Sequence, residues 1–288
     1  MGNFNGGMGG KTILITGGTS GIGKAAATAL AAMGADVTIT GSNPERGEKA
    51  LAEIRSESGG FVELILADLS VQDEVRRLAE KFKESHDRLD VLVNNAGLVQ
   101  SKRTETPDGI ETTLAINHLA PFLLTNLLLG LLEESAPGRV VTTSSEAERW
   151  RTLDFDDLQS KRKYRGMPVY GMTKLANIMF TYELAERLEG TGVTANCLHP
   201  GAVSTNFGTN NNGIGTLLFR AFKPFMRSPE QGADTLIWLA SSPEVEGVSG
   251  KYYSDRKEIK PKKIANDPTA RKKLWTMSES LTGLKVAA

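Results

Sequence analysis

The chain has 288 residues, and its 34 basic and 34 acidic side chains balance to a formal net charge of +0 at pH 7. This balance gives no electrostatic reason to expect a nucleic acid or a strongly anionic partner. The length suffices for one large core, and α/β enzymes of this size are often single domains. The single cysteine, Cys197, cannot form an internal disulfide. We therefore expect a reducing compartment, the cytoplasm, and an inert packing role for Cys197.

The N-terminal residues 1–10 are rich in glycine and lack the apolar stretch of a secretory signal. We expect this segment to be flexible and residues 11–288 to form one domain. The one long apolar run, 119–132, contains Pro121 and is too short to span a bilayer. We predict that it is a buried helix and expect no membrane contact.

From residue 11 onward, short apolar strands alternate with helices. The first strand leads into an alanine-rich helix over 21–33, which Gly34 stops, and Pro44 suits the first turn of a charged helix over 44–55. Strands are predicted at 12–16, 37–40, 61–66, 89–93, 139–143 and 193–198. Near-continuous apolar strands separated by helices predict a single-domain α/β fold: a doubly wound parallel sheet of the Rossmann type with helices on both faces.

A glycine-rich turn, Thr16-Gly-Gly-Thr-Ser-Gly-Ile-Gly23, lies between the first strand and the first helix. This context distinguishes it from an ordinary strand-to-helix loop, which is the alternative. Gly17 permits a tight turn, Gly21 lets the backbone approach a pyrophosphate, and Gly23 lets helix and strand pack closely. Phosphates would then lie at the helix N-terminus. The turn predicts a dinucleotide cofactor.

A tyrosine and a lysine stand four residues apart in Tyr170-Gly-Met-Thr-Lys174, so both side chains share one helical face. A free tyrosine has a pKa of about 10 and is a poor base at neutral pH. We expect Lys174 and an oxidised nicotinamide to favour the tyrosinate; a pKa lowered by roughly three units corresponds to about 4 kcal/mol. Tyr170 would then take a proton from an alcohol or return one to a carbonyl. A solvated pair on a helix surface is the alternative.

These motifs and three later ones follow the order of the short-chain dehydrogenase/reductase family, which the chain resembles over roughly its whole length. The later motifs are Asn94-Asn-Ala-Gly97 after the fourth strand, Ser145 after the fifth, and Pro200-Gly-Ala-Val-Ser-Thr205 after the sixth. The resemblance implies that Ser145 donates a hydrogen bond to the substrate oxygen and that Asn117 holds a water linking Lys174 to solvent. Ser144 competes with Ser145, and only the family spacing to Tyr170 favours Ser145. The catalytic set so implied is Asn117, Ser145, Tyr170 and Lys174, with no metal.

The resemblance also implies a nicotinamide cofactor. The second strand ends in Thr40-Gly-Ser-Asn-Pro-Glu-Arg46, without the acidic residue that would bind the ribose 2′-hydroxyl of NAD. We therefore favour NADP, with NAD as the alternative, and assign its 2′-phosphate to Ser42, Asn43 and Arg46. The residues expected to bind the cofactor are Gly17, Thr19, Ser20, Gly21, Ile22, Gly23, Ser42, Asn43, Arg46, Asp68, Leu69, Asn94, Ala96, Gly97, Tyr170, Lys174, Pro200, Gly201, Val203 and Thr205.

Within the family, the chain looks most like the retinol-dehydrogenase-like branch. The features are Thr112-Thr-Leu-Ala-Ile-Asn-His-Leu119, Phe155-Asp-Asp-Leu-Gln-Ser160, Lys174-Leu-Ala-Asn177, Ser249-Gly-Lys-Tyr-Tyr-Ser-Asp255 and Leu274-Trp275. Such members often carry an N-terminal membrane anchor, which we do not find in this sequence. That departure weakens the transfer of a membrane-delivered lipid substrate to this chain.

The segment around 205–229 ends in an apolar and basic stretch and is interpreted as a mobile lid over the substrate. A helix packed on the sheet and an amphipathic element on a membrane are the alternatives. An apolar lid suggests a small apolar aldehyde, ketone or alcohol. We thus expect an NAD(P)-dependent oxidoreductase that moves a hydride between cofactor and substrate. A catalytically silent sensor or scaffold is the alternative, and an epimerase or dehydratase is a third hypothesis. Homo-oligomerisation through helices around 119–132 and 170–188 is a hypothesis from the family.

Overall fold

The computed structural model describes residues 7–203 and 226–284. Its strands are β1 (Thr12–Ile15), β2 (Asp36–Gly41), β3 (Val62–Leu66), β4 (Val91–Asn94), β5 (Gly138–Thr143), β6 (Val193–Leu198), β7 (Lys251–Ser254) and β8 (Lys257–Glu258). Its main helices are α1 (Gly21–Ala32), α2 (Pro44–Ser58), α3 (Gln72–Ser85), α4 (Thr112–Leu114), α5 (Ala120–Glu134), α6 (Gly166–Arg187), α8 (Pro229–Ser241) and α9 (Pro268–Thr282). Short helical turns are η1 (Ala115–Leu119), η2 (Glu146–Arg149), η4 (Pro243–Val245) and η5 (Lys263–Asn266).

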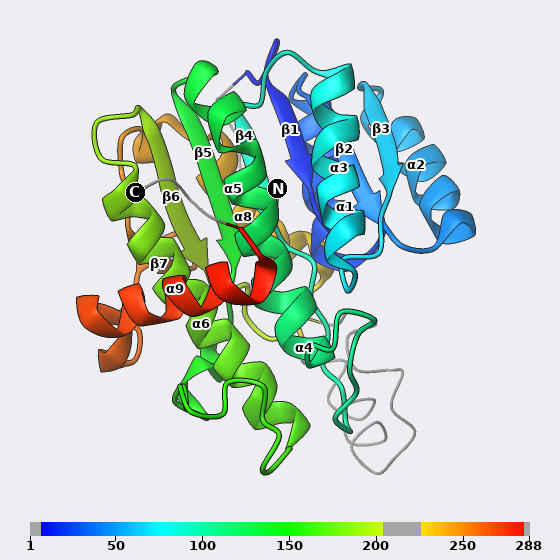
Figure 1. Ribbon diagram of the computed structural model, residues 1–288. Coiled ribbons are helices and arrows are strands. Elements are labelled where there is room, and N and C mark those ends of the chain that lie inside the picture. Colours follow the sequence, from blue (N-terminus) through cyan, green and yellow to red (C-terminus); the bar gives the residue numbers. More distant parts are fainter. Residues whose placement is uncertain (1–6, 204–225, 285–288) are drawn as a thin grey trace.

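The strands form one 8-stranded sheet in the order β3-β2-β1-β4-β5-β6-β7-β8 (Figure 1). All neighbouring pairs are parallel except β7 and β8. From β1 the chain first builds outward through β2 and β3, then returns to the other side of β1 with β4. This reversal of strand order leaves a crevice at the carboxyl ends of β1 and β4, where ligands bind in open α/β sheets. The predicted doubly wound parallel sheet is confirmed.

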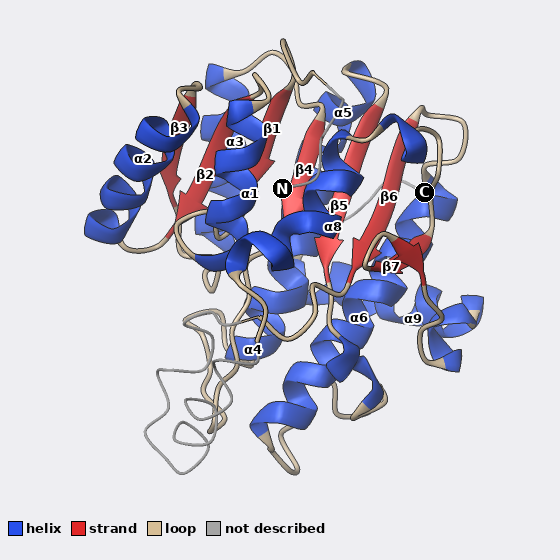
Figure 2. Cartoon of the chain, turned by 180° about the vertical axis from the view of Figure 1, so that it is seen from behind, coloured by secondary structure: helices blue, strands red, loops and turns tan. Residues whose placement is uncertain are grey.

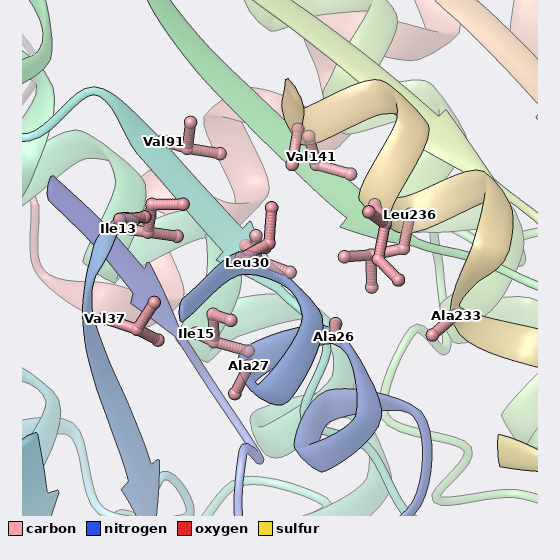
Figure 3. Close-up of a cluster of buried hydrophobic side chains, with 14 of the residues drawn as sticks. Ile13, Ile15, Ala26, Ala27, Leu30, Val37, Val91, Val141, Ala233 and Leu236 are labelled. Atoms are coloured by element: carbon pink, nitrogen blue, oxygen red, sulfur yellow. The ribbon is translucent and has the colours of Figure 1, made fainter. Parts of the chain in front are cut away.

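Helices cover both faces of the sheet, because the strands are apolar on both sides. Helices α1, α2 and α8 pack on one face (Figure 2), and their core joins strand residues such as Ile13 and Ile15 to Leu30 of α1 and Leu236 of α8 (Figure 3). Helices α3, α5 and α6 pack on the opposite face, around Leu14 and other strand side chains. Burial of each such side chain contributes about 1.5–3 kcal/mol to folding.

The chain from Thr112 to Glu134 is one continuous helical stretch of 23 residues. By length and composition alone, it is long and apolar enough to cross a membrane. The apolar run 119–132 is thus part of a longer helix than expected, because the turn η1 joins α4 to α5. The helix is nevertheless part of the core, since 67% of its most apolar window is buried inside the protein.

Other differences from the sequence prediction lie at the ends of elements. Helix α2 continues to Ser58 and stops where Gly59 adopts a left-handed backbone, with φ 64°. Strands β7 and β8 were not predicted, because they are short and mix polar with aromatic residues. Within the segment 1–10, which we expect to be flexible, Met8 is buried, and its backbone N–H donates to Met33 O at 2.9 Å. Residues 1–6 lie outside the described part of the chain.

Helix α9 closes the structure over α5 and α6. Its Trp275 ring lies 4.9 Å from Phe122 and 5.9 Å from Phe180, measured between ring centroids. Its Ser278 Oγ is 2.9 Å from Nε2 of His118, and the other ring nitrogen of His118 is 3.4 Å from Asn177 Oδ1. Because the imidazole is buried, the pKa of His118 is lowered to about 4.

This histidine should make folding stability depend on pH. The folded protein keeps His118 neutral, whereas the unfolded chain protonates it near pH 6.5. Its contribution is therefore present above pH 6.5 and is lost as the pH falls toward 4, by about 3 kcal/mol in total. We expect urea unfolding at pH 7.5 and pH 5 to show about 2 kcal/mol of this loss in the wild type, because pH 5 is still above the folded pKa, and a smaller loss in His118→Gln. Equal losses in the two proteins would contradict the assignment.

Candidate active site

A cleft of ≈ 960 Å³ opens at the carboxyl ends of the central strands, between the glycine-rich turn and helix α6. Its position is the crevice that the strand order creates. A volume of this size is sufficient for a dinucleotide with a small second ligand. The predicted site residues that line it are Gly17, Thr19, Ser20, Gly21, Ile22, Ser42, Arg46, Asp68, Leu69, Ala96, Gly97, Ser145, Tyr170, Lys174, Pro200, Gly201 and Val203.

The glycine-rich turn can be formed only with glycine at particular positions. Gly17 and Gly21 have φ values of 68° and 53°, in the left-handed region that side chains disfavour. Gly23 faces the turn from inside α1, and a Cβ placed there would lie 2.3 Å from Gly17 O. The absence of that atom allows the helix to start directly against the end of β1.

The N-terminus of α1 is open to an anion. Ser20 occupies the N-cap position, but its side chain makes no capping hydrogen bond, and the first turn contains no acidic residue. The backbone N–H groups of this turn therefore remain free of side-chain acceptors, at the positive end of the helix dipole. Together with the backbone close to Gly21, these donors fit a pyrophosphate group.

Asn95, which was not among the predicted site residues, joins the end of β1 to the end of β4. Its backbone N–H donates to Thr16 Oγ1 at 3.0 Å, and its side-chain amide donates to Thr16 O at 3.1 Å. It also lines the cleft. The predicted Asn94 does not: its buried amide donates to Thr125 Oγ1 at 2.9 Å. Side chains alternate along a strand, so Asn94 faces α5 and its neighbour faces the cleft.

At the end of β2, Ser42 and Arg46 reach the cleft but Asn43 does not. Asn43 caps α2 instead, because its Oδ1 accepts a hydrogen bond from the backbone N–H of Arg46 at 2.8 Å. Arg46 is exposed, and among the described residues no hydrogen bond or ion pair occupies its guanidinium. An exposed cation in the first turn of a helix is available to a second anionic group.

Close contacts hold α6 against the carboxyl end of β5. Lys174 Nζ donates to Thr143 O at 3.0 Å, and Ser144 Oγ donates to Lys174 O at 2.7 Å. A Cβ on Gly171 would lie 2.2 Å from Ala147 O, so the helix approaches η2 more closely than any other residue type would allow. Ser144 and Ser145 both line the cleft, but the Ser144 hydroxyl is engaged by the helix backbone, so Ser145 is the serine available to Tyr170 and a ligand.

Ser145 and Tyr170 are hydrogen-bonded to each other. Burial raises the pKa of Tyr170 to about 12, and the bond from Ser145 lowers it only in part. Burial also lowers the pKa of Lys174 to about 8, with Nζ 5.5 Å from the centroid of the tyrosine ring. The lowering of the Tyr170 pKa expected from Lys174 together with an oxidised nicotinamide stays a prediction, since it concerns the protein with its cofactor bound. Low polarity disfavours charge on both groups, so Tyr170 keeps its proton.

Asn117 is fully buried in the π-helical turn η1 and does not line the cleft. Its Oδ1 accepts from Leu98 N at 2.8 Å, and its Nδ2 donates to Leu98 O at 2.9 Å and to Thr173 Oγ1 at 3.0 Å. The side chain thus joins the loop after β4 to helix α6. A π-helical turn shifts backbone hydrogen bonds and often occurs at functional sites. The proton-relay role of Asn117 stays a prediction.

The end of β6 forms the last wall of the cleft. Gly201 has a φ of 82°, and a Cβ there would lie 2.8 Å from the Arg227 side chain. Val203 pairs with Arg227 in an isolated bridge. Met226, beside this bridge, also lines the cleft and was not predicted. Thr205 and most of the lid expected over 205–229 lie outside the described residues.

The chain is similar in sequence to known proteins. The family model described as short chain dehydrogenase matches residues 11–213. Retinol dehydrogenase 14 of Homo sapiens is 44% identical over 295 residues, with 96% of this chain and 88% of that protein covered. A protein of Streptomyces sp. (strain C5), provisionally named daunorubicin C-13 ketoreductase DnrU, is 41% identical over 283 residues, with 98% and 96% covered.

The fold is also similar to that of solved structures. An uncharacterised protein from Mycobacterium paratuberculosis superposes with a TM-score of 0.80 at 30% identity, covering 98% of this chain and 97% of that one. A short chain dehydrogenase from Burkholderia cenocepacia, solved in complex with NADP, superposes with a TM-score of 0.69 at 30% identity, covering 85% and 96%. The cleft, the glycine-rich turn and the Ser145–Tyr170–Lys174 group accordingly belong to an oxidoreductase of alcohol or carbonyl groups, and the chain is a member of the short-chain dehydrogenase/reductase family, in its retinol-dehydrogenase-like branch.

Proposed function

We propose that this protein is an NADP(H)-dependent reductase of small apolar aldehydes or ketones, which also oxidises the matching alcohols. The observation that carries the proposal is the convergence of Ser145, Tyr170 and Lys174 on the same cleft as the glycine-rich turn. The silent sensor hypothesis would tolerate loss of this group. The presence of all its members, with Ser145 hydrogen-bonded to Tyr170, therefore favours an enzyme.

The bound dinucleotide would supply or accept the hydride, and the chain's own residues would manage the oxygen and the proton. Ser145 donates a hydrogen bond to the substrate oxygen and fixes its position. Tyr170, whose pKa is raised to about 12 by burial, holds the proton that a carbonyl oxygen receives as it becomes a hydroxyl. Lys174, held by Thr143 O, lies beside the phenol and stabilises negative charge that develops on it.

The preference for NADP rests on the end of β2. No acidic side chain stands there to repel a 2′-phosphate, and Ser42 and Arg46 both line the cleft. The guanidinium of Arg46 can form charge-assisted hydrogen bonds with phosphate oxygens. The Burkholderia relative solved with NADP supports the same choice. Asn43, as the cap of α2, contributes by placing Arg46 and not by touching the phosphate.

The apolar substrate class rests on the lining of the cleft. Leu98, Ile116, Trp150, Met167 and Met226 are among the apolar side chains that line the cleft. Two of the relatives are named as a retinol dehydrogenase and a daunorubicin C-13 ketoreductase, which supports an alcohol or carbonyl substrate. A cytoplasmic location and a homo-oligomeric state remain hypotheses, and α9 packs over part of the α5 and α6 surface assigned to self-association.

Replacement of the proton donor tests the catalytic proposal. Tyr170→Phe should lower kcat for NADPH-dependent aldehyde reduction by about 100- to 10,000-fold, because the phenol proton is lost while the ring is kept. Tyr182→Phe, on the same helix but outside the cleft, is the matched control and should retain activity. NADPH consumption followed by absorbance gives both values. Equal activity of Tyr170→Phe and the wild type would refute the assignment.

Removal of the Arg46 guanidinium tests cofactor choice. Arg46→Ala should raise the KM for NADPH by about 10- to 100-fold and leave the KM for NADH nearly unchanged, since only NADPH carries the 2′-phosphate. Lys49→Ala removes the same charge from the same helix at a side chain that is 77% exposed, and should change neither value. A parallel loss for both cofactors in Arg46→Ala would count against NADP selection by this residue.

A methyl group at Gly23 tests the phosphate-binding turn. Gly23→Ala would force Cβ against Gly17 O, so the turn must shift and dinucleotide affinity should fall by about 5- to 100-fold. Gly130→Ala, in α5, adds its Cβ where no atom lies within 4 Å and serves as the control. Fluorescence titration with NADPH measures the affinity, and thermal unfolding separates a local shift from global loss of structure. Unchanged affinity in Gly23→Ala would show that the turn is not the binding element.

A further inference from the structure

Two large apolar side chains are exposed on the rim of the catalytic cleft. Trp150 is 57% exposed and Met167 is 45% exposed, and both line the cleft. The other large hydrophobic side chains that are exposed in the described part of the chain, Phe61 and Leu66, belong to the β3 edge and do not reach the cleft. Exposure of large apolar side chains inside a functional cleft marks a surface that a ligand covers.

The backbone that carries Trp150 is fixed, so its exposed indole does not result from a loose loop. The backbone N–H of Trp150 donates to Ala147 O at 3.0 Å. The Cβ of Trp150 packs against Gly171, since a Cβ added to this glycine would lie 3.5 Å from it. On its other side, Arg149 Nη2 donates to Lys260 O at 2.9 Å. The indole is therefore attached directly against the helical turn that follows Tyr170.

Met167 approaches the same place from α6 itself. Met167, Tyr170 and Lys174 are spaced by three and four residues, which puts them on one face of the helix. The catalytic phenol and the thioether thus lie next to each other along the cleft wall. A thioether adapts its shape to an irregular apolar surface, whereas an indole presents a rigid flat face.

We propose that Trp150 is a specificity-determining residue: its indole stacks on the flat apolar body of a conjugated or aromatic carbonyl substrate, and Met167 covers the adjacent edge. This inference rests on the proposed reductase function and adds the shape of the substrate to it. A planar body gains contact with the whole indole face, whereas a puckered saturated ring touches only part of it. Short aldehydes reach Tyr170 without touching Trp150.

Kinetics with three aldehydes test the proposal: planar 2-naphthaldehyde, puckered cyclohexanecarbaldehyde and short propanal. Trp150→Ala should lower kcat/KM for 2-naphthaldehyde by about 10- to 30-fold, mainly through KM, and leave propanal within about twofold. Trp150→Phe should restore most of the loss, and Met167→Ala should show a smaller loss with the same order of substrates. Phe61→Ala removes an aromatic ring that is 54% exposed far from the cleft and should change nothing.

A fluorescence measurement tests binding without turnover. The chain has three tryptophans, and Trp238 and Trp275 are only 8% and 3% exposed, so acrylamide should quench mainly Trp150. Unreactive 2-naphthol, added with NADP, should protect the wild type from acrylamide. Trp150→Phe should lose the quenchable component and with it the protection.

The outcomes separate this inference from the proposed function. Protection by 2-naphthol without turnover of any aldehyde would refute the reductase proposal and support the role of Trp150 in binding. Turnover with no protection, or equal losses of kcat on all three aldehydes in Trp150→Ala, would overturn the specificity role, because a structural effect would not distinguish the substrates. If the wild type shows neither turnover of any aldehyde nor protection by 2-naphthol, both proposals are overturned.

Discussion

The attachment of α6 to the carboxyl end of β5 is the constraint on which the site depends. The Lys174 ammonium donates to Thr143 O, the Ser144 hydroxyl donates to Lys174 O in the helix backbone, and the bare Cα of Gly171 packs against Ala147 O. The two hydrogen bonds use buried polar groups, so loosening the helix would leave carbonyl oxygens and an ammonium without these partners. This penalty fixes the helix, and with it the positions of Tyr170 and Ser145 relative to the sheet.

The same burial determines the chemical state of the site. Low polarity opposes a charge on the phenol and on the ammonium, which raises the pKa of Tyr170 and lowers the pKa of Lys174. A sequence argument based on the spacing of the two residues includes their attraction but not the cost of removing both from water. In the protein alone the desolvation effect is larger. In the proposed mechanism Tyr170 would therefore give a proton readily, and the tyrosinate needed for alcohol oxidation would require further positive charge in the cleft.

The sequence predicts the sheet well because its strands are apolar runs bounded by glycine, and it predicts the turn because Gly17, Gly21 and Gly23 are required by backbone sterics. It does not distinguish neighbours whose side chains alternate. Asn94 and Asn95 look equivalent in the motif, yet only Asn95 reaches the cleft. Asn43 resembles a phosphate ligand in sequence, but a helix start needs a cap, and this local hydrogen bond engages the side chain. No sequence pattern identifies Trp150 as a cleft residue, because its exposure depends on how the turn η2 packs against the rest of the protein.

A line of hydrogen bonds connects the two halves of the cleft. Asn95 donates to Thr16 O beside the glycine-rich turn, and its Oδ1 lies 3.5 Å from the hydroxyl of Thr143. The carbonyl of Thr143 in turn accepts from Lys174. The glycine-rich turn and the helix that carries Tyr170 are thus tied through one asparagine at the ends of three adjacent parallel strands. In the proposed reaction the rate depends on the distance between the nicotinamide and a carbonyl at Tyr170, and this line of hydrogen bonds holds the two sides of the cleft at a fixed separation.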